Sequence, residues 1–184
     1  PPDNEIWYTT TDGQPLGLNN DSHSDTYRNG RGVLKFNNSE LLYEIQYRFF
    51  ESQSTLKSVI LPNSVTIIGD DAFYGCSSLE KVAIASSTLA GALSSDSAAG
   101  CLLQYAKTVL MPGTVQPSSY LQNKYANREQ IIRDGVAYWL LDQNVHNWQE
   151  TQTLIERVPC QIDGLIRYTC DHCNNYKDVT VERH

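Results

Sequence analysis

The 184-residue sequence has one methionine, five cysteines and no long run of apolar or basic residues. Because its uninterrupted apolar stretches are short, no segment is expected to span a membrane. The formal net charge is −7 and the pI is near 5.0. An acidic chain without a basic cluster is a poor match for a phosphate backbone, which excludes nucleic acid as the expected partner. The length suffices for one core, or for a repeat array with a small additional module.

The short motifs of common enzyme classes are also missing. The sequence contains no Gly-x-Ser-x-Gly, no phosphate-binding glycine-rich loop and no His-Glu-x-x-His. The adjacent acids Asp70 and Asp71 fall in a predicted turn, where carboxylates usually cap the backbone and face solvent. We therefore predict that the protein is not an enzyme.

What the sequence does contain is a repeat with a period of 23 residues. The clearest copy has apolar residues at Leu56, Val59, Leu61, Val65, Ile68, Phe73 and Leu79. Stepping back 23 positions from the first six gives Val33, Phe36, Asn38, Leu42, Ile45 and Phe50, of which only Asn38 is polar. A fixed period of this length with a Leu-x-x-Val-x-Leu core predicts a leucine-rich solenoid. Such solenoids bind partners along a surface and seldom perform chemistry.

The segment from Leu56 to Leu79 resembles one complete BspA-type leucine-rich repeat. Residues 5–13 and 30–36 are similar to the lead-in of bacterial members of that family, and the resemblance extends over roughly residues 5–115. It implies a mainly β fold with short helices, built as a right-handed α/β leucine-rich-repeat solenoid with an N-terminal cap. It also implies a secreted or surface-anchored bacterial protein that adheres to host or matrix components.

We expect three parts along the chain. Residues 1–32 would form an N-terminal β cap, because the end of a solenoid exposes apolar surface. Residues 33–126 would form the solenoid, with a Ser/Ala-rich loop at 85–99 and a closing helix at 120–126. Residues 127–184 would form a separate small β module with strands at 136–141, 165–169 and 176–181. His23 lies in a polar stretch predicted to be a solvated loop.

The predicted strands place two rows of side chains on the outer face of the solenoid. One row contains Lys35, Ser58, Lys81 and Thr108, and the next contains Asn37, Ile60, Ala83 and Leu110. A partly apolar row flanked by lysines predicts a ligand-binding strip. Two alternatives remain open, because these side chains would also be compatible with ordinary surface or with a face covered by the C-terminal module.

Five cysteines cannot all pair within one chain. Cys76 and Cys101 are predicted to be small buried side chains on neighbouring turns, with a disulfide between them as the alternative. The other three, Cys160, Cys170 and Cys173, lie near the C-terminus. Cys170 and Cys173 have the Cys-x-x-Cys spacing that binds one Zn²⁺.

The stretch from His146 to His184 resembles a short module that recurs in bacterial surface proteins. It has a His-x-Trp, a lone Cys, a Tyr-Thr-Cys-x-x-Cys and a trailing His, but Asn174 stands where the module usually has Gly. Three hypotheses follow for its cysteines. They are a structural zinc site of Cys160, Cys170, Cys173 and His146, a disulfide from Cys160 to one of the pair in an oxidising compartment, and reduced thiols.

Together these observations predict a non-catalytic binding protein outside the cytoplasm, secreted or anchored at the cell surface. Its expected partner is a host or matrix protein or a glycan. The alternative is a structural spacer in a larger envelope protein, with a zinc-stapled C-terminal module. A third possibility is a polysaccharide-binding appendage of an enzyme.

Overall fold

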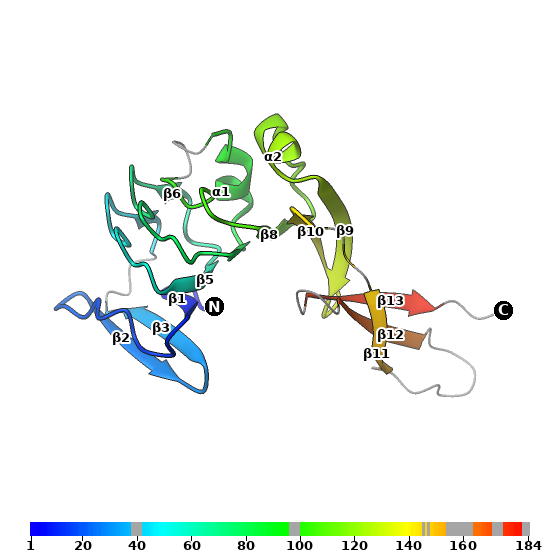
Figure 1. Cartoon of the computed structure of the whole chain (residues 1–184), viewed down its shortest axis with the longest axis horizontal. Helices are drawn as coiled ribbons and strands as arrows, with labels where there is room; N and C mark the ends of the chain where they lie inside the picture. The colour runs from blue at the N-terminus through cyan, green and yellow to red at the C-terminus, as the bar shows by residue number, and fades with distance from the viewer. Residues whose placement is uncertain are drawn as a thin grey trace.

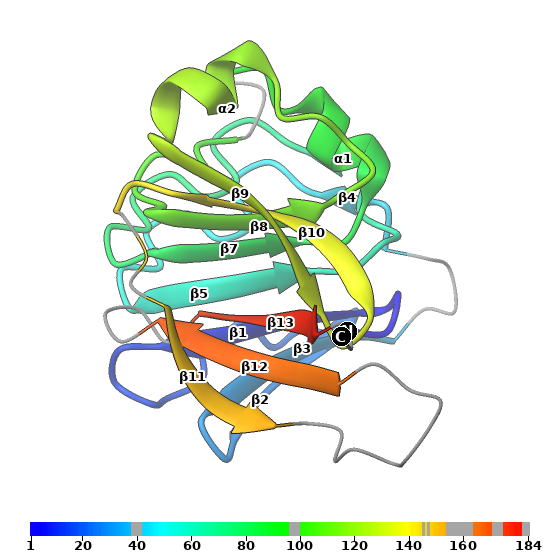
Figure 2. The same cartoon turned by 90° about the vertical axis from the view of Figure 1, so that its right-hand side faces the viewer.

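A computed structural model describes residues 1–37, 42–95, 100–144, 146, 148–153, 164–170 and 175–181. In this part of the chain, eleven strands form one large sheet in the order β11-β12-β13-β9-β10-β8-β7-β5-β1-β3-β2 (Figures 1 and 2). Its strands are β1 (Glu5–Thr10), β2 (His23–Arg28), β3 (Arg31–Phe36), β5 (Leu56–Leu61), β7 (Lys81–Ile84), β8 (Thr108–Pro112), β9 (Asn127–Arg133), β10 (Val136–Asp142), β11 (Trp148–Thr153), β12 (Gly164–Cys170) and β13 (Tyr176–Val181). The predicted mainly β character is confirmed.

Successive repeats contribute one parallel strand each to the middle of the sheet. Val59 of β5 lies opposite Val82 of β7, and Val82 lies opposite Val109 of β8. The two steps are 23 and 27 residues. The four extra residues of the second step therefore lie in the connection between β7 and β8, and the strands themselves stay in register. These three valines are buried, because alternate residues of each strand point into the core.

The side of the repeats opposite the large sheet keeps the same 23-residue register. The short strands β4 (Glu44–Ile45) and β6 (Ile67–Ile68) pair in parallel, with Ile45 opposite Ile68. The rings of Phe50 and Phe73 stack with centroids 4.8 Å apart and an interplanar angle of 17°. Both rings are fully buried, so equivalent repeat positions meet in the core.

The cap does not stack on the repeats as one more parallel strand. Instead β1 lies between β3 and β5 and is antiparallel to both. Tyr8 of β1 lies opposite Gly32, and a side chain on Gly32 would overlap the Tyr8 ring. The Tyr8 hydroxyl donates to Asp25 and accepts from the Leu16 N–H, which ties β1 to β2. Burial raises the pKa of this tyrosine, and its hydrogen bond to Asp25 adds to the increase.

Two local predictions differ from the structure. His23 was expected to be solvated, but it begins β2 and is only 4% exposed, since its ring packs on Phe36 and Phe49. The loop expected at 85–99 contains helix α1 (Ser87–Ala92). Its first turn is capped by the Ser86 hydroxyl, which accepts from the Leu89 N–H.

The closing helix expected at 120–126 is present as α2 (Ser119–Lys124), capped by Ser118. Neither helix is long enough to cross a membrane, and no other described segment forms a long apolar helix. Figure 1 shows both helices at the same end of the repeat region.

The large sheet continues without a break past residue 127. β10 pairs with β8, where Leu140 lies opposite Leu110, and β9 pairs with β10. The strands predicted at 136–141, 165–169 and 176–181 correspond to β10, β12 and β13. They were expected in a separate module, but β10 pairs with β8 and so extends the sheet of the repeats. Figure 2 shows β11, β12 and β13 in front of the strands of the cap.

An ion-pair network joins β12 and β13 to the turn between β9 and β10. Arg167 Nε lies 2.7 Å from Asp178 Oδ1, and Arg167 Nη2 lies 2.8 Å from Asp134 Oδ1. The hydrogen bond from Arg167 holds the pKa of Asp178 below its usual range. The Asp178 carboxylate is buried and also accepts from the Asp134 N–H, so its charge is compensated from two elements.

Candidate functional site

The outward side chains of the parallel strands form two rows. Ser58 lies opposite Lys81 and Lys81 opposite Thr108, while Ile60 lies opposite Ala83 and Ala83 opposite Leu110. The intervening residues, such as Val59 and Leu61, are buried in the core. The expected alignment of these six residues is confirmed, since side chains alternate between the two faces of a strand.

The other two residues of the predicted strip lie elsewhere. Lys35 of β3 is two strands away from β5 and lies opposite Glu5, with Nζ 3.9 Å from Glu5 Oε1. Asn37 follows the end of β3 and donates from Nδ2 to the Asp21 carbonyl. The predicted alignment of Lys35 and Asn37 with Ser58 and Ile60 is wrong, because β1 occupies the place beside β5.

The inserted strand supplies its own side chains to both rows. Thr9 lies opposite Ser58, and their hydroxyl oxygens are 2.6 Å apart. Trp7 lies opposite Ile60 and Val33, so it joins β3 to β5 in the apolar row. Sequence reasoning missed Trp7, although the burial of Ile6 and Tyr8 on either side is the alternation that points it outward.

Trp7 is held by two polar neighbours. Its indole N–H donates to Glu5 Oε2 at 2.9 Å, and the Arg31 guanidinium carbon lies 4.1 Å from the ring centroid. A cation over an indole face is a favourable arrangement, so the ring has a fixed orientation. We define the strand face as the outward residues Val33, Trp7, Ile60, Ala83, Leu110, Thr9, Ser58 and Lys81.

The side chains of the strand face become less accessible toward β10. Leu110 is half-buried and lies opposite Leu140, which is 1% exposed. Thr108 is buried as well, and its hydroxyl donates to Asp142 Oδ2 at 2.5 Å. Thr108 therefore contributes to a buried hydrogen bond and is less accessible than the half-buried Ser58 and Lys81.

Cys76 is buried and forms no disulfide, which confirms the prediction that it is a small buried side chain. Its Sγ donates to the Phe50 carbonyl at 3.1 Å. Burial raises the pKa of the Cys76 thiol to about 12, so it stays protonated near neutral pH. Cys101 is half-buried rather than buried as predicted, and the alternative disulfide between Cys101 and Cys76 is not present.

The proposed zinc ligands are only partly within the described residues. Cys160 and Cys173 lie outside them. Cys170 is buried at the end of β12, opposite Trp148 of β11. His146 stacks on Trp148 at 4.8 Å and places Nε2 3.7 Å from Asp142 Oδ2. The described residues contain no group of three metal-binding side chains, but His146 and Cys170 both adjoin Trp148.

Residues 24–104 match the family described as "BspA type Leucine rich repeat region (6 copies)". This part of the chain therefore belongs to the BspA-type leucine-rich repeats. No curated protein and no solved structure matches the chain. The match runs from the second residue of β2 past β7 and α1 and includes most of the strand face. Most of the strand face therefore lies on a repeat module of a class that mediates protein interactions.

Proposed function

We propose that the chain is a non-catalytic binding protein located outside the cytoplasm, secreted or held at the cell surface. It engages a host or matrix protein or a glycan through the strand face. The observation that carries this proposal is the apolar row that runs across five neighbouring strands, from Val33 through Trp7, Ile60 and Ala83 to Leu110. The match of residues 24–104 to the BspA-type repeats, a family typical of surface proteins, supports a location outside the cytoplasm.

The chemistry of the strand face fits that role. Specific protein interfaces place an aromatic anchor and apolar side chains in the middle and polar groups around them. Here Trp7 and Ile60 provide the apolar centre, and the row of Thr9, Ser58 and Lys81 provides hydrogen-bond donors and acceptors along one side. These half-buried side chains become fully buried only when a partner covers them.

Replacing Ile60 with glutamate is expected to weaken partner binding by at least about tenfold, because a desolvated carboxylate would face the partner. The measurement is binding to an immobilised panel of matrix proteins and glycans. Ile67→Glu is the matched control, since Ile67 belongs to the same repeat, is 50% exposed and lies in β6, away from the strand face.

The circular dichroism spectra and melting temperatures of both variants should stay close to those of the parent protein. Equal binding by the two variants, at the level of the parent protein, would contradict a role for the strand face. The spacer alternative would then gain support, because a spacer needs no ligand surface.

We also propose that Cys160, Cys170, Cys173 and His146 hold a structural zinc ion. Supporting this, Cys170 and His146 both adjoin Trp148. The cysteines bind zinc as thiolates and the histidine as a neutral imidazole, so protonation of these ligands should release the metal as the pH falls.

Zinc chelation is expected to increase amide hydrogen exchange in β11, β12 and β13 and to leave β5 and β7 protected. The reason is that metal binding contributes directly to the folding of its own module, whereas stacked repeats depend on their neighbours. Elemental analysis and a free-thiol count accompany the exchange measurement. A metal-free protein with Cys160 disulfide-bonded to Cys170 or Cys173 would rule out the zinc site.

A further inference from the structure

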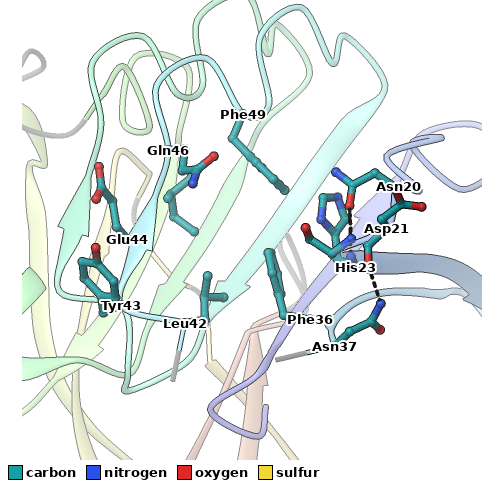
Figure 3. Close-up of a pocket in the computed structure, with 12 residues that line it drawn as sticks. Asn20, Asp21, His23, Phe36, Asn37, Leu42, Tyr43, Glu44, Gln46 and Phe49 are labelled. Carbon is teal, nitrogen blue, oxygen red and sulfur yellow. Dashed lines mark hydrogen bonds between the residues drawn. The ribbon is translucent and has the colours of Figure 1, made fainter. Parts of the chain in front are cut away.

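A pocket of about 670 Å³ lies where the cap meets the first repeat, away from the strand face (Figure 3). The cap contributes the start of β2 and the end of β3, and the repeat contributes β4 and the residues around it. The pocket is lined by Asn20, Asp21, Ser22, His23, Phe36, Asn37, Leu42, Tyr43, Glu44, Ile45, Gln46 and Phe49. None of the residues that line it belongs to the strand face or to the proposed zinc ligands.

One wall of the pocket is aromatic. The His23 ring lies 5.0 Å from the Phe36 ring and 5.2 Å from the Phe49 ring, and the two phenylalanine rings are 6.0 Å apart. Figure 3 shows these three rings on one side of the pocket, with Tyr43 and Glu44 on the other. The faces of the two phenylalanine rings carry negative electrostatic potential and attract cations.

His23 has unused hydrogen-bonding capacity. Its side chain is more than nine-tenths buried, yet within the described structure neither ring nitrogen has a hydrogen-bond partner. Its backbone is fixed, because the His23 N–H donates to Asn20 Oδ1 at 3.0 Å. A buried imidazole that lines a pocket without a protein partner is arranged to meet a group from outside the chain.

The charges of the pocket have one sign. Asp21 and Glu44 line it, no lysine or arginine does, and neither carboxylate makes an ion pair or side-chain hydrogen bond in the part of the chain that the structure describes. Glu44 is half-buried, which makes its uncompensated charge more costly than that of a fully exposed acid. The ionisable groups that line the pocket are Asp21 and His23 from the cap and Tyr43 and Glu44 from the repeat; β3 contributes none.

We propose that this pocket binds an arginine side chain of a basic peptide segment in a partner protein. A guanidinium group donates to carboxylates in a planar geometry and also stacks on aromatic rings. The pocket offers both, with Glu44 as a carboxylate acceptor on one side, and with Asp21, a ring nitrogen of His23 and the aromatic wall of Phe36 and Phe49 on the other. The volume exceeds that of one side chain, so neighbouring peptide atoms enter with it.

The test uses two short peptides, acetyl-Gly-Arg-Gly-amide and its neutral counterpart acetyl-Gly-Gln-Gly-amide. Binding to the full chain is followed by NMR chemical shifts, including those of the His23 imidazole. The arginine peptide should bind saturably and shift the His23 signals, whereas the glutamine peptide should bind at least about tenfold more weakly.

Two variants with the same change in net charge distinguish binding in the pocket from a general attraction of the basic peptide to an acidic protein. Glu44→Gln should weaken binding of the arginine peptide by about tenfold. Glu51→Gln should leave it unchanged, since Glu51 pairs with Arg48 at 3.4 Å and does not line the pocket.

Three results would overturn the proposal: equal binding of both peptides, equal effects of Glu44→Gln and Glu51→Gln, or shifts confined to residues outside the pocket. Saturable binding of N-acetylglucosamine in place of the arginine peptide would do so as well, and would assign the pocket to a sugar. None of these results depends on the strand face. Ile60→Glu should bind the arginine peptide like the parent protein, so failure at one site is distinguishable from failure at the other.

Discussion

Replacing Phe73 with alanine is expected to lower the free energy of unfolding by about 3–5 kcal/mol, as for other fully buried phenylalanines. The ring has no exposed surface and stacks on Phe50 of the preceding repeat. Truncation leaves a cavity between two turns, and neither turn can close it without breaking the bond from the Phe50 N–H to the Ala72 carbonyl. Urea unfolding measures the loss.

Tyr74→Ala is the control, because Tyr74 adjoins Phe73 in sequence but is 53% exposed. Its truncation should cost less than about 1 kcal/mol. A loss below about 1 kcal/mol for Phe73→Ala would mean that the repeats do not stack through this position.

The Gly69→Ala variant should lose about 1–3 kcal/mol in the same assay, an effect typical of overpacking. A Cβ at Gly69 would come within 2.6 Å of the Tyr47 backbone nitrogen and 3.1 Å of the Ile45 carbonyl oxygen. The Ile45 carbonyl already accepts from the Gly69 N–H at 2.7 Å, so the added carbon would push the two turns apart at this hydrogen bond. Backbone atoms cannot rotate away as a side chain would.

Gly91→Ala is the matched control and should have the opposite sign. Gly91 lies in α1, where the nearest atom to an added Cβ is Val115 Cγ1 at 3.9 Å. Alanine is favoured over glycine in a helix by about 0.8–1.0 kcal/mol. A neutral or stabilising Gly69→Ala would show that the two turns are not in close contact.

The part of the fold that depends on the repeat period could be predicted from the sequence. Phe50 and Phe73 are 23 residues apart and occupy the same repeat position. Residues 57–65 are also similar to residues 107–115, 50 positions later, and this similarity relates β5 to β8 despite the longer second step. Each of these relations is carried by similar residues at a fixed separation.

The position of β1 could not be predicted in the same way. A period relates residues 33–38 to residues 56–61, but nothing in it reveals that residues 5–10 pair between them. His23 shows a second limit: it is surrounded by polar residues in the chain, whereas its ring packs on Phe36 and Phe49, which come from β3 and the first repeat. Both errors arise from long-range pairing, and the position of β1 explains why Lys35 was misplaced and Trp7 was missed.

The antiparallel partners on both sides of β5, β7 and β8 limit how the array can change in length. At one edge β1 occupies the position that another parallel repeat would need, and at the other edge β10 does the same. A new repeat added before β5 or after β8 would have to displace a paired strand. Lengthening by gene duplication, or by design, should therefore succeed only by insertion between β5 and β8, where each new strand finds a parallel neighbour on both sides.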